Sequence, residues 1–297
     1  MGPSNDPKDR WTLKQMASEI TVQDRVPEDR GNTGGEQATS AESKPVPALV
    51  RFNAIMDALS TDPRPRGVSE LARELALPRS TVHGLLRTLA DLQILMRVNE
   101  TDFVVGPHVL AWASAFNSQN SLTKAFTALA DRSGVPETIN LSILVGSEVM
   151  YISCRQGSDP LGVRFREGLR FPAAFTATGK AILSTMPQDE VEEIVQGGLP
   201  IGLTAKSIDS VEALRSELAE TRARGYSIDD GQVREAMICC GAPVFAAGSE
   251  TRAVAGVAMA MLSGKATESD TSSLGRSVSA FAEELSRRLG ANLVSSG

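Results

Sequence analysis

Hydrophobic residues begin to recur at helical spacing at Val46, and the pattern predicts a helix that ends near Ser60. The positions that carry this pattern are Leu49, Phe52, Ile55, Met56 and Leu59. After a stretch with two prolines and a glycine, a short helix is predicted over residues 69–76, with Ser69 as its N-cap. A third helix is predicted over residues 80–91, with its aliphatic residues on one face.

Two short apolar runs follow the third helix, at residues 94–98 and 103–105, with four polar residues between them. This pattern predicts a β-hairpin. Three helices followed by a hairpin is the element order of a winged helix-turn-helix domain, which we place at residues 45–107. Residues 1–44 are rich in Pro, Gly, Ser, Thr and charge, and they predict a mostly disordered tail.

Residues 109–130 have a helical pattern that polar residues interrupt, so a linker helix is predicted over residues 108–120. Strands and helices alternate beyond it, and a second domain is predicted over residues 121–297. Its predicted strands span residues 139–145, 148–154, 161–166, 242–245 and 253–261. Its predicted helices span residues 178–186 and 211–224 and a stretch from Leu274 to Leu289. The predicted fold class is therefore α+β, with two domains joined by a helix.

The chain has 297 residues, three cysteines, two histidines and a formal net charge of −6. Cys239 and Cys240 are adjacent, where a disulfide would be strained, and this excludes a disulfide-rich secreted domain. No apolar run approaches the roughly 18 residues that cross a bilayer. We therefore expect a soluble, cytoplasmic protein with no membrane contact. The scarcity of histidines also predicts no metal site, and we expect no cofactor.

Arginines concentrate in the first domain although the whole chain is acidic. Between Arg64 and Arg97 there are six arginines and three acidic residues, an excess of three positive charges. Such an excess is typical of a surface that binds the phosphates of double-stranded DNA, and a helix-turn-helix places its last helix in the major groove. The predicted DNA contacts are Arg66, Arg79, Ser80, Thr81, His83, Arg87 and Arg97. A solvated helical bundle without a nucleic-acid partner is the alternative.

Motifs in both domains follow one another in an order that points to a known family. The first domain contains Leu77-Pro78-Arg79-Ser80-Thr81-Val82-His83 and Val105-Gly106-Pro107. The second contains Phe171-Pro172, Thr176-Ala177-Thr178-Gly179-Lys180-Ala181, Arg224-Gly225-Tyr226-Ser227-Ile228-Asp229-Asp230 and Cys239-Cys240-Gly241-Ala242-Pro243-Val244-Phe245. Over roughly residues 46–290, the chain resembles the IclR family of bacterial transcriptional regulators.

The resemblance implies a GAF-like effector-binding domain and an effector-responsive regulator, interpreted as a repressor of a catabolic operon. It also implies a homodimer or tetramer that binds a pseudo-palindromic operator. The pocket positions that it implies are Leu161, Val163, Phe165, Phe171, Ala177, Thr178, Asp229, Cys239, Ala258 and Ala260. Members that bind small oxo-acids have serines where this chain has Ala258 and Ala260, which favours a less polar effector, a carboxylate or an aromatic compound.

Three features leave alternatives open. Cys239 and Cys240 are compatible with a GAF-like cysteine-based redox enzyme or redox sensor, with passive buried thiols, or with a ligand contact. Lys180 follows a glycine as in a P-loop, but the remaining positions do not match, and a structural lysine is favoured. Trp112 and Phe116 form an apolar stripe on the linker helix that serves either core packing or a dimer contact.

Overall fold

A computed structural model describes residues 46–158 and 162–292. These residues divide into two compact units, with the boundary between Ser118 and Gln119. The predicted tail over residues 1–44 and the predicted pocket residue Leu161 lie outside the described residues. Within the part of the chain that is described, no helix has the length and hydrophobicity needed to cross a membrane.

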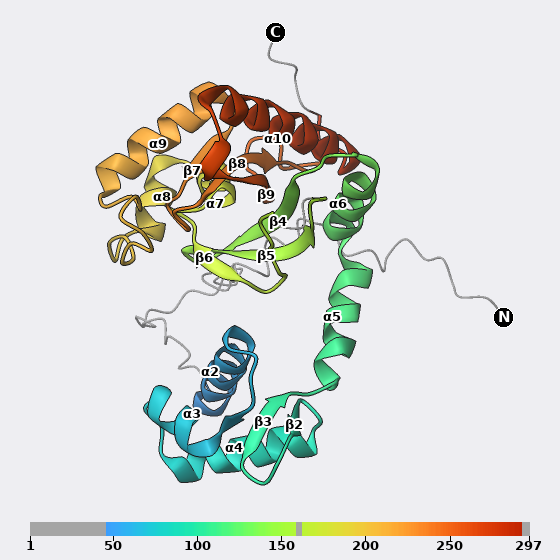
Figure 1. Cartoon of the computed structure of the whole chain (residues 1–297), viewed down its shortest axis with the longest axis vertical. Coiled ribbons are helices and arrows are strands. Elements are labelled where there is room, and N and C mark those ends of the chain that lie inside the picture. The colour runs from blue at the N-terminus through green and yellow to red at the C-terminus, as the bar shows by residue number, and fades with distance from the viewer. Residues whose placement is uncertain (1–45, 159–161, 293–297) are drawn as a thin grey trace, which may run out of the picture. The chain divides into compact units, whose positions relative to one another are not determined.

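The N-terminal unit is a winged helix-turn-helix (Figure 1). Its elements are α2 (Pro47–Thr61), β1 (Arg66–Gly67), α3 (Val68–Glu74), α4 (Arg79–Asp91), β2 (Leu95–Arg97), β3 (Asp102–Val105) and α5 (His108–Gln119). The strands form an antiparallel sheet in the order β1-β3-β2, and the two-residue β1 is too short to leave a pattern in the sequence. The N-cap of α3 is Gly67, so the prediction of Ser69 as the cap is wrong.

Helices α2, α3 and α4 enclose the core of the N-terminal unit. Ile55 and Leu59 from α2, Leu71 from α3, and Val82 and Leu86 from α4 are at most 1% exposed. Burying each such side chain contributes roughly 1.5–3 kcal/mol of transfer free energy. Because the leucines and Val82 anchor one face of α4, its opposite face is presented to solvent.

The C-terminal unit is built on one antiparallel sheet in the order β6-β5-β4-β9-β8-β7 (Figure 1). Its strands are β4 (Thr138–Val145), β5 (Glu148–Arg155), β6 (Arg170–Pro172), β7 (Ser227–Asp230), β8 (Met237–Val244) and β9 (Ala255–Leu262). Its α-helices are α6 (Ser121–Arg132), α7 (Ala177–Leu183), α8 (Gln188–Ile194), α9 (Val211–Arg224) and α10 (Glu268–Arg288), and a 3₁₀ turn, η2, spans Ser263–Lys265. The predicted α+β fold class is confirmed.

One predicted strand of this unit is wrong. The segment expected as a strand over residues 161–166 has no regular structure over its described part, residues 162–166. Its hydrogen bonds go elsewhere, because Thr138 Oγ1 donates to the carbonyl of Val163 at 2.5 Å and Gln156 Nε2 donates to that of Phe165 at 2.6 Å. The apolar residues of this segment therefore reflect burial against the sheet and not strand pairing.

The sheet is covered on both faces. Helices α6 and α10 pack on one face, against residues that include Ile139 and Leu141 of β4. Helix α7 lies on the other face, with α8 and α9 around it. Because side chains alternate along a strand, Thr138, Asn140 and Ser142 of β4 face α7. This α7-facing side of the sheet is the side that carries the predicted pocket residues.

Helix α7 approaches the sheet so closely that glycine is required beneath it. A Cβ atom at Gly241 of β8 would lie 2.5 Å from the carbonyl carbon and oxygen of Ala177. Since the clash is with backbone, no rotamer change relieves it. The lack of a side chain at Gly241 thus allows the first residue of α7 to contact β8 directly.

We expect Gly241→Ala to lower the free energy of unfolding by roughly 1–3 kcal/mol, the usual cost of overpacking. Gly264→Ala is the matched control, because nothing lies within 4 Å of the Cβ that it would add. Urea denaturation of the two variants beside the wild type measures both effects. Equal stability of the two variants would contradict the close approach.

Candidate DNA interface and effector pocket

The exposed face of α4 carries most of the residues predicted to bind DNA. Arg79, Ser80, His83 and Arg87 are exposed, and Thr81 is half-buried. A hollow of about 800 Å³ brings Arg79, Ser80 and His83 together with Arg97 of the wing. A second hollow of about 640 Å³ joins His83, Arg87 and Arg97. Within the wing, Arg97 is held over the ring of Phe103, 5.4 Å from its centroid.

Arg66 does not belong to this surface, and its assignment as a DNA contact is wrong. Its side chain is 3% exposed. Its guanidinium donates to Glu70 at 3.0 Å, to the carbonyl of Ala58 at 3.1 Å and to Glu74. Such a group holds α2 and α3 together, with four of its five N–H donors bonded inside the unit and its side chain buried away from a phosphate.

Three acidic residues of the N-terminal unit, Asp62, Glu70 and Glu74, are paired with arginines that support the fold. Glu70 pairs with Arg64 as well as with Arg66, and the hydrogen bond from Arg64 lowers the pKa of Glu70. Arg79, Arg87 and Arg97 pair with no acidic side chain among the described residues. The positive charge of these three arginines is therefore not neutralised within the protein and can be offered to phosphates.

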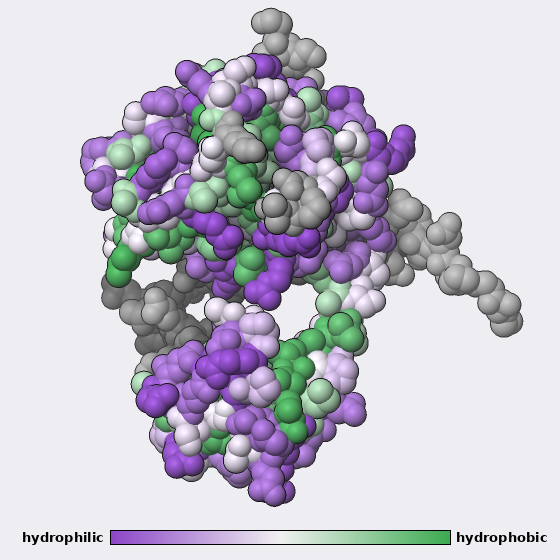
Figure 2. All heavy atoms as spheres, viewed as in Figure 1, coloured by the Kyte–Doolittle hydropathy of each residue, from purple (hydrophilic) through white to green (hydrophobic). Residues whose placement is uncertain are grey.

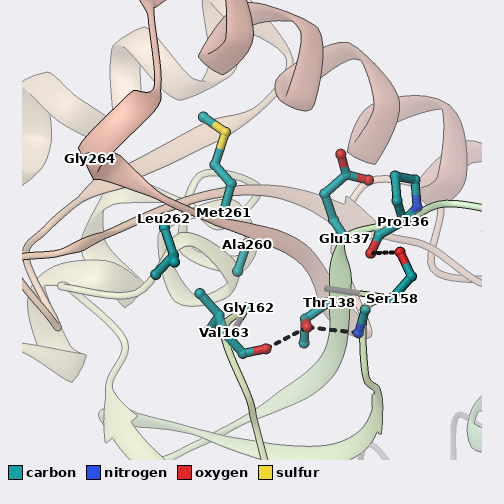
Figure 3. A pocket seen from close by; sticks show the side chains of 11 residues that line it. Pro136, Glu137, Thr138, Ser158, Gly162, Val163, Ala260, Met261, Leu262 and Gly264 are labelled. Carbon is teal, nitrogen blue, oxygen red and sulfur yellow. Dashed lines mark hydrogen bonds between the residues drawn. The ribbon is translucent and has the colours of Figure 1, made fainter. Parts of the chain in front are cut away.

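The C-terminal unit contains a cavity of about 630 Å³ at one end of its two central strands, β4 and β9 (Figure 3). It lies between the start of β4, the end of β9 and the segment that leads to Val163. Thr138, Val163 and Ala260 converge on it, and Thr138 Oγ1 accepts a hydrogen bond from the amide of Gly157 at 2.9 Å. The remaining lining residues are Pro136, Glu137, Gly157, Ser158, Gly162, Met261, Leu262 and Gly264. Two predicted pocket residues, Val163 and Ala260, therefore line a cavity.

Other predicted pocket residues share the α7-facing core that continues from this cavity. Phe165 and Phe171 both pack on Tyr151, with ring centroids 5.3 and 5.6 Å apart. Cys239 and Ala258 are buried in the same cluster. These side chains form an apolar and aromatic wall. Tyr151 was missed from the sequence, because an aromatic residue in a strand gives no signal that separates a pocket wall from ordinary core.

Ala177 and Thr178 lie in the first turn of α7, and both are buried. The hydroxyl of Thr176 caps this helix by accepting a hydrogen bond from the amide of Gly179 at 2.9 Å. The hydroxyl of Thr178 has no hydrogen-bond partner. The predicted pair is thus held in place by the cap, and Thr178 presents an unused polar group.

Asp229 lies on β7, directly opposite Cys239 of β8. Its carboxylate accepts hydrogen bonds from the amides of Gln232 at 2.6 Å and Val233 at 3.3 Å. Burial raises the pKa of Asp229 from 3.8 to about 6, although nearby Lys180 and the two amides oppose the shift. Asp229 therefore shapes the turn after β7 in addition to facing the predicted pocket.

Lys180 is fully buried, in agreement with the structural interpretation of the sequence. Its ammonium donates to Glu217 and Gln232 at 3.0 Å each, and to the carbonyl of Ile228. Burial lowers the pKa of Lys180, and the carboxylate of Glu217 opposes this effect. The lysine joins α7, α9 and β7 and has no remaining proton to offer a ligand.

Cys239 and Cys240 are buried, and Cys154 is half-buried. Burial raises the pKa of Cys154 and Cys240 to about 12 and that of Cys239 well above its ordinary value. Because the thiolate is the reactive form, these environments suppress nucleophilic and redox chemistry. The redox alternative thus loses its chemical basis.

Helix α5 carries exposed apolar residues. Trp112 and Phe116 are 48% and 37% exposed, and Leu110 is 68% exposed. Hydrophobic residues lie at the surface along this helix (Figure 2). The interpretation of Trp112 and Phe116 as core residues is therefore wrong, since no residue of α5 is buried.

Comparison with known proteins assigns each unit to a protein family. Residues 48–98 match the family described as "IclR helix-turn-helix domain", and residues 114–287 match "Bacterial transcriptional regulator IclR C-terminal". The transcriptional repressor IclR of Escherichia coli is 27% identical over 227 residues, which cover 74% of this chain and 82% of that protein.

Solved structures agree with these matches. The repressor BlcR of Agrobacterium tumefaciens is 38% identical, with a TM-score of 0.55, and the match covers 84% of this chain and all (100%) of that one. An IclR homologue from Microbacterium hydrocarbonoxydans, complexed with 4-hydroxybenzoate, has a TM-score of 0.63 at 21% identity, with 81% and 99% of the two chains covered.

The fold, the DNA-facing helix and the separate effector domain define a DNA-binding transcriptional regulator and not an enzyme. The chain belongs to the IclR family.

We expect Arg79→Ala and Arg87→Ala each to weaken DNA binding about tenfold and to reduce its salt dependence by about one counterion. Arg276→Ala on α10 removes the same charge from an exposed position in the other unit and should leave affinity unchanged. Arg66→Ala should instead lower the melting temperature, because it breaks buried bonds. Fluorescence anisotropy and thermal melting separate these outcomes. Unchanged affinity in both α4 variants would contradict the assigned surface.

Asp229 should make stability depend on pH. Its pKa is raised in the folded state, so its favourable contribution is present below about pH 4 and is lost as the pH rises through about 6. Relative to wild type, Asp229→Asn should therefore gain stability between pH 4 and pH 7, by at most about 3 kcal/mol. Urea unfolding at both pH values measures this gain. A stability difference from wild type that does not change with pH for Asp229→Asn would contradict the raised pKa.

Proposed function

We propose that this chain represses a catabolic operon and releases its operator when a small organic effector binds the C-terminal unit. The observation that carries the proposal is the presence on one chain of an unneutralised arginine surface on α4 and the wing and, in a separate unit, a ligand-sized cavity. We further infer that the protein acts in the cytoplasm, where the operator is accessible.

The effector that we propose is a small carboxylate or an aromatic compound. A volume of about 630 Å³ falls within the usual range for small-molecule sites. The rings of Tyr151, Phe165 and Phe171 belong to the same buried cluster as the lining residues Val163 and Ala260, which favours an aromatic ligand. The 4-hydroxybenzoate bound by the Microbacterium homologue has this character and serves as a first probe.

Self-association is part of the proposal. The exposed apolar side chains of Leu110, Trp112 and Phe116 on α5 favour contact with a second copy of the chain. A twofold dimer, alone or within a tetramer, presents two copies of α4 and therefore matches a pseudo-palindromic operator. An effector that binds one arrangement of the units better than the other shifts operator affinity, and such coupling is typically worth about 1–3 kcal/mol.

Selection of duplexes from a random pool with the full-length protein tests DNA recognition. We expect enrichment of a sequence with two related half-sites and its release by an effector from a panel of organic acids that includes 4-hydroxybenzoate. Absence of any preference over random competitor at moderate salt would exclude the proposed function.

Ala260→Leu tests whether the cavity is the effector site. The larger side chain fills part of the cavity, so we expect effector affinity to fall at least about tenfold while DNA affinity without effector is unchanged. Leu262→Ala is the control. Leu262 lines the same cavity at the end of β9, and its truncation enlarges the cavity without blocking it. A normal effector dose curve for Ala260→Leu would place the effector elsewhere.

A further inference from the structure

Three buried oxygen atoms on the α7-facing side of the sheet have no hydrogen-bond partner among residues 46–158 and 162–292. They are Oδ1 of Asn140, Oγ of Ser142 and Oγ1 of Thr178. Their residues are 1%, 0% and 2% exposed. Buried polar atoms are nearly always hydrogen-bonded, and leaving one unpaired costs about 1–3 kcal/mol. A cluster of three such atoms therefore requires an explanation.

Strand register brings the three groups together. Asn140 lies opposite Ala258 of β9, and Ser142 lies opposite Gly256. Thr178 lies above the same glycine, because a Cβ atom at Gly256 would be 3.0 Å from Cβ of Thr178. The groups thus surround a stretch of β9 that has no side chain larger than a methyl group on this face.

The cluster continues the cavity along the sheet. Thr138 and Ala260, which line the cavity, are paired in register and lie two residues before Asn140 and Ala258 on the same face. At the far end, α7 closes over Gly256. Asn140 and Ala258 therefore lie between the cavity lining and the start of α7.

Asn140 has no suitable partner in the sheet itself. Its neighbours in register are Cys154 on β5 and Ala258 on β9, a weakly polar thiol and a methyl group. An apolar residue would fill the same place without the cost of burying an amide. A polar residue kept at such a position is typical of a ligand-binding site.

We propose that Asn140, which neither the sequence nor the family matches single out, binds the polar end of the effector, together with Ser142 and Thr178. The inference rests on the proposed function of the C-terminal unit. The ligand class is an organic molecule whose buried end carries a hydroxyl group, because a hydroxyl can donate to Oδ1 of Asn140 and accept from Ser142 or Thr178. Its apolar body occupies the cavity beside Val163 and Ala260.

Calorimetric titration of the full-length protein with 4-hydroxybenzoate and with benzoate tests this assignment, because the two differ only in the hydroxyl. We expect wild type to bind 4-hydroxybenzoate at least about tenfold more tightly than benzoate. Asn140→Leu, which has the same branching, should reduce that ratio to about one and leave the affinity for benzoate nearly unchanged. Asn140→Ala is a second variant, in case the leucine perturbs packing. It should likewise reduce the ratio of the two affinities to about one.

Thr123→Val is the matched control. Thr123 Oγ1 is another buried oxygen without a partner, but it lies on α6, at the opposite face of the sheet. Its removal should leave both affinities unchanged. Melting temperatures add a readout that needs no ligand, since Asn140→Leu should be at least as stable as wild type when no hydrogen bond is lost.

Several results would overturn the proposal. A marked loss of stability in both Asn140 variants would assign the residue a structural role. An unchanged ratio in these variants would leave only internal water as the partner of Asn140, and equal losses for both compounds would place a carboxylate there and not a hydroxyl. If wild type binds neither compound, the ligand class is wrong. Selective DNA binding by the same preparations would show that the proposed function survives any of these outcomes.

Discussion

The buried ammonium group of Lys180 is the interaction on which the C-terminal unit most depends. A charge this deep in the protein is tolerated only when its protons are all bonded, and Glu217, Gln232 and the carbonyl of Ile228 supply the three acceptors. These acceptors come from α9, from the loop after β7 and from β7 itself. The lysine therefore fixes α7, including its first turn, against three other segments.

Close packing against two glycines also fixes the position of α7 on the sheet. Gly241 and Gly256 allow the start of α7 to lie directly on the sheet, so the helix closes one end of the apolar space. At the opposite end the small side chain of Ala260 leaves room for the cavity. A ligand there would contact strands from the middle of the sheet, and its binding free energy would act on the elements that Lys180 holds together.

In the N-terminal unit, charge pairing decides which arginines are available to bind DNA. Arg64 and Arg66 are bound to Asp62, Glu70 and Glu74, so arginines and acids in the helix-turn-helix neutralise one another where they support the fold. The arginines of α4 and the wing remain available. A local count of charges along the sequence is therefore a guide to DNA binding, but it does not identify which arginines are free.

The sequence alone determined the helices of the first unit, the β4–β5 hairpin, the end of α9 at Gly225 and the family, because these depend on local periodicity, turn chemistry and ordered motifs. Only the tertiary structure decided that Arg66 is internal, that residues 162–166 form no strand, and that Asn140, Ser142 and Thr178 lie together on the α7-facing side of the sheet. Burial and the choice of hydrogen-bond partners depend on residues that are far apart in the chain. Strand register and helix packing create these relations, and no local pattern encodes them.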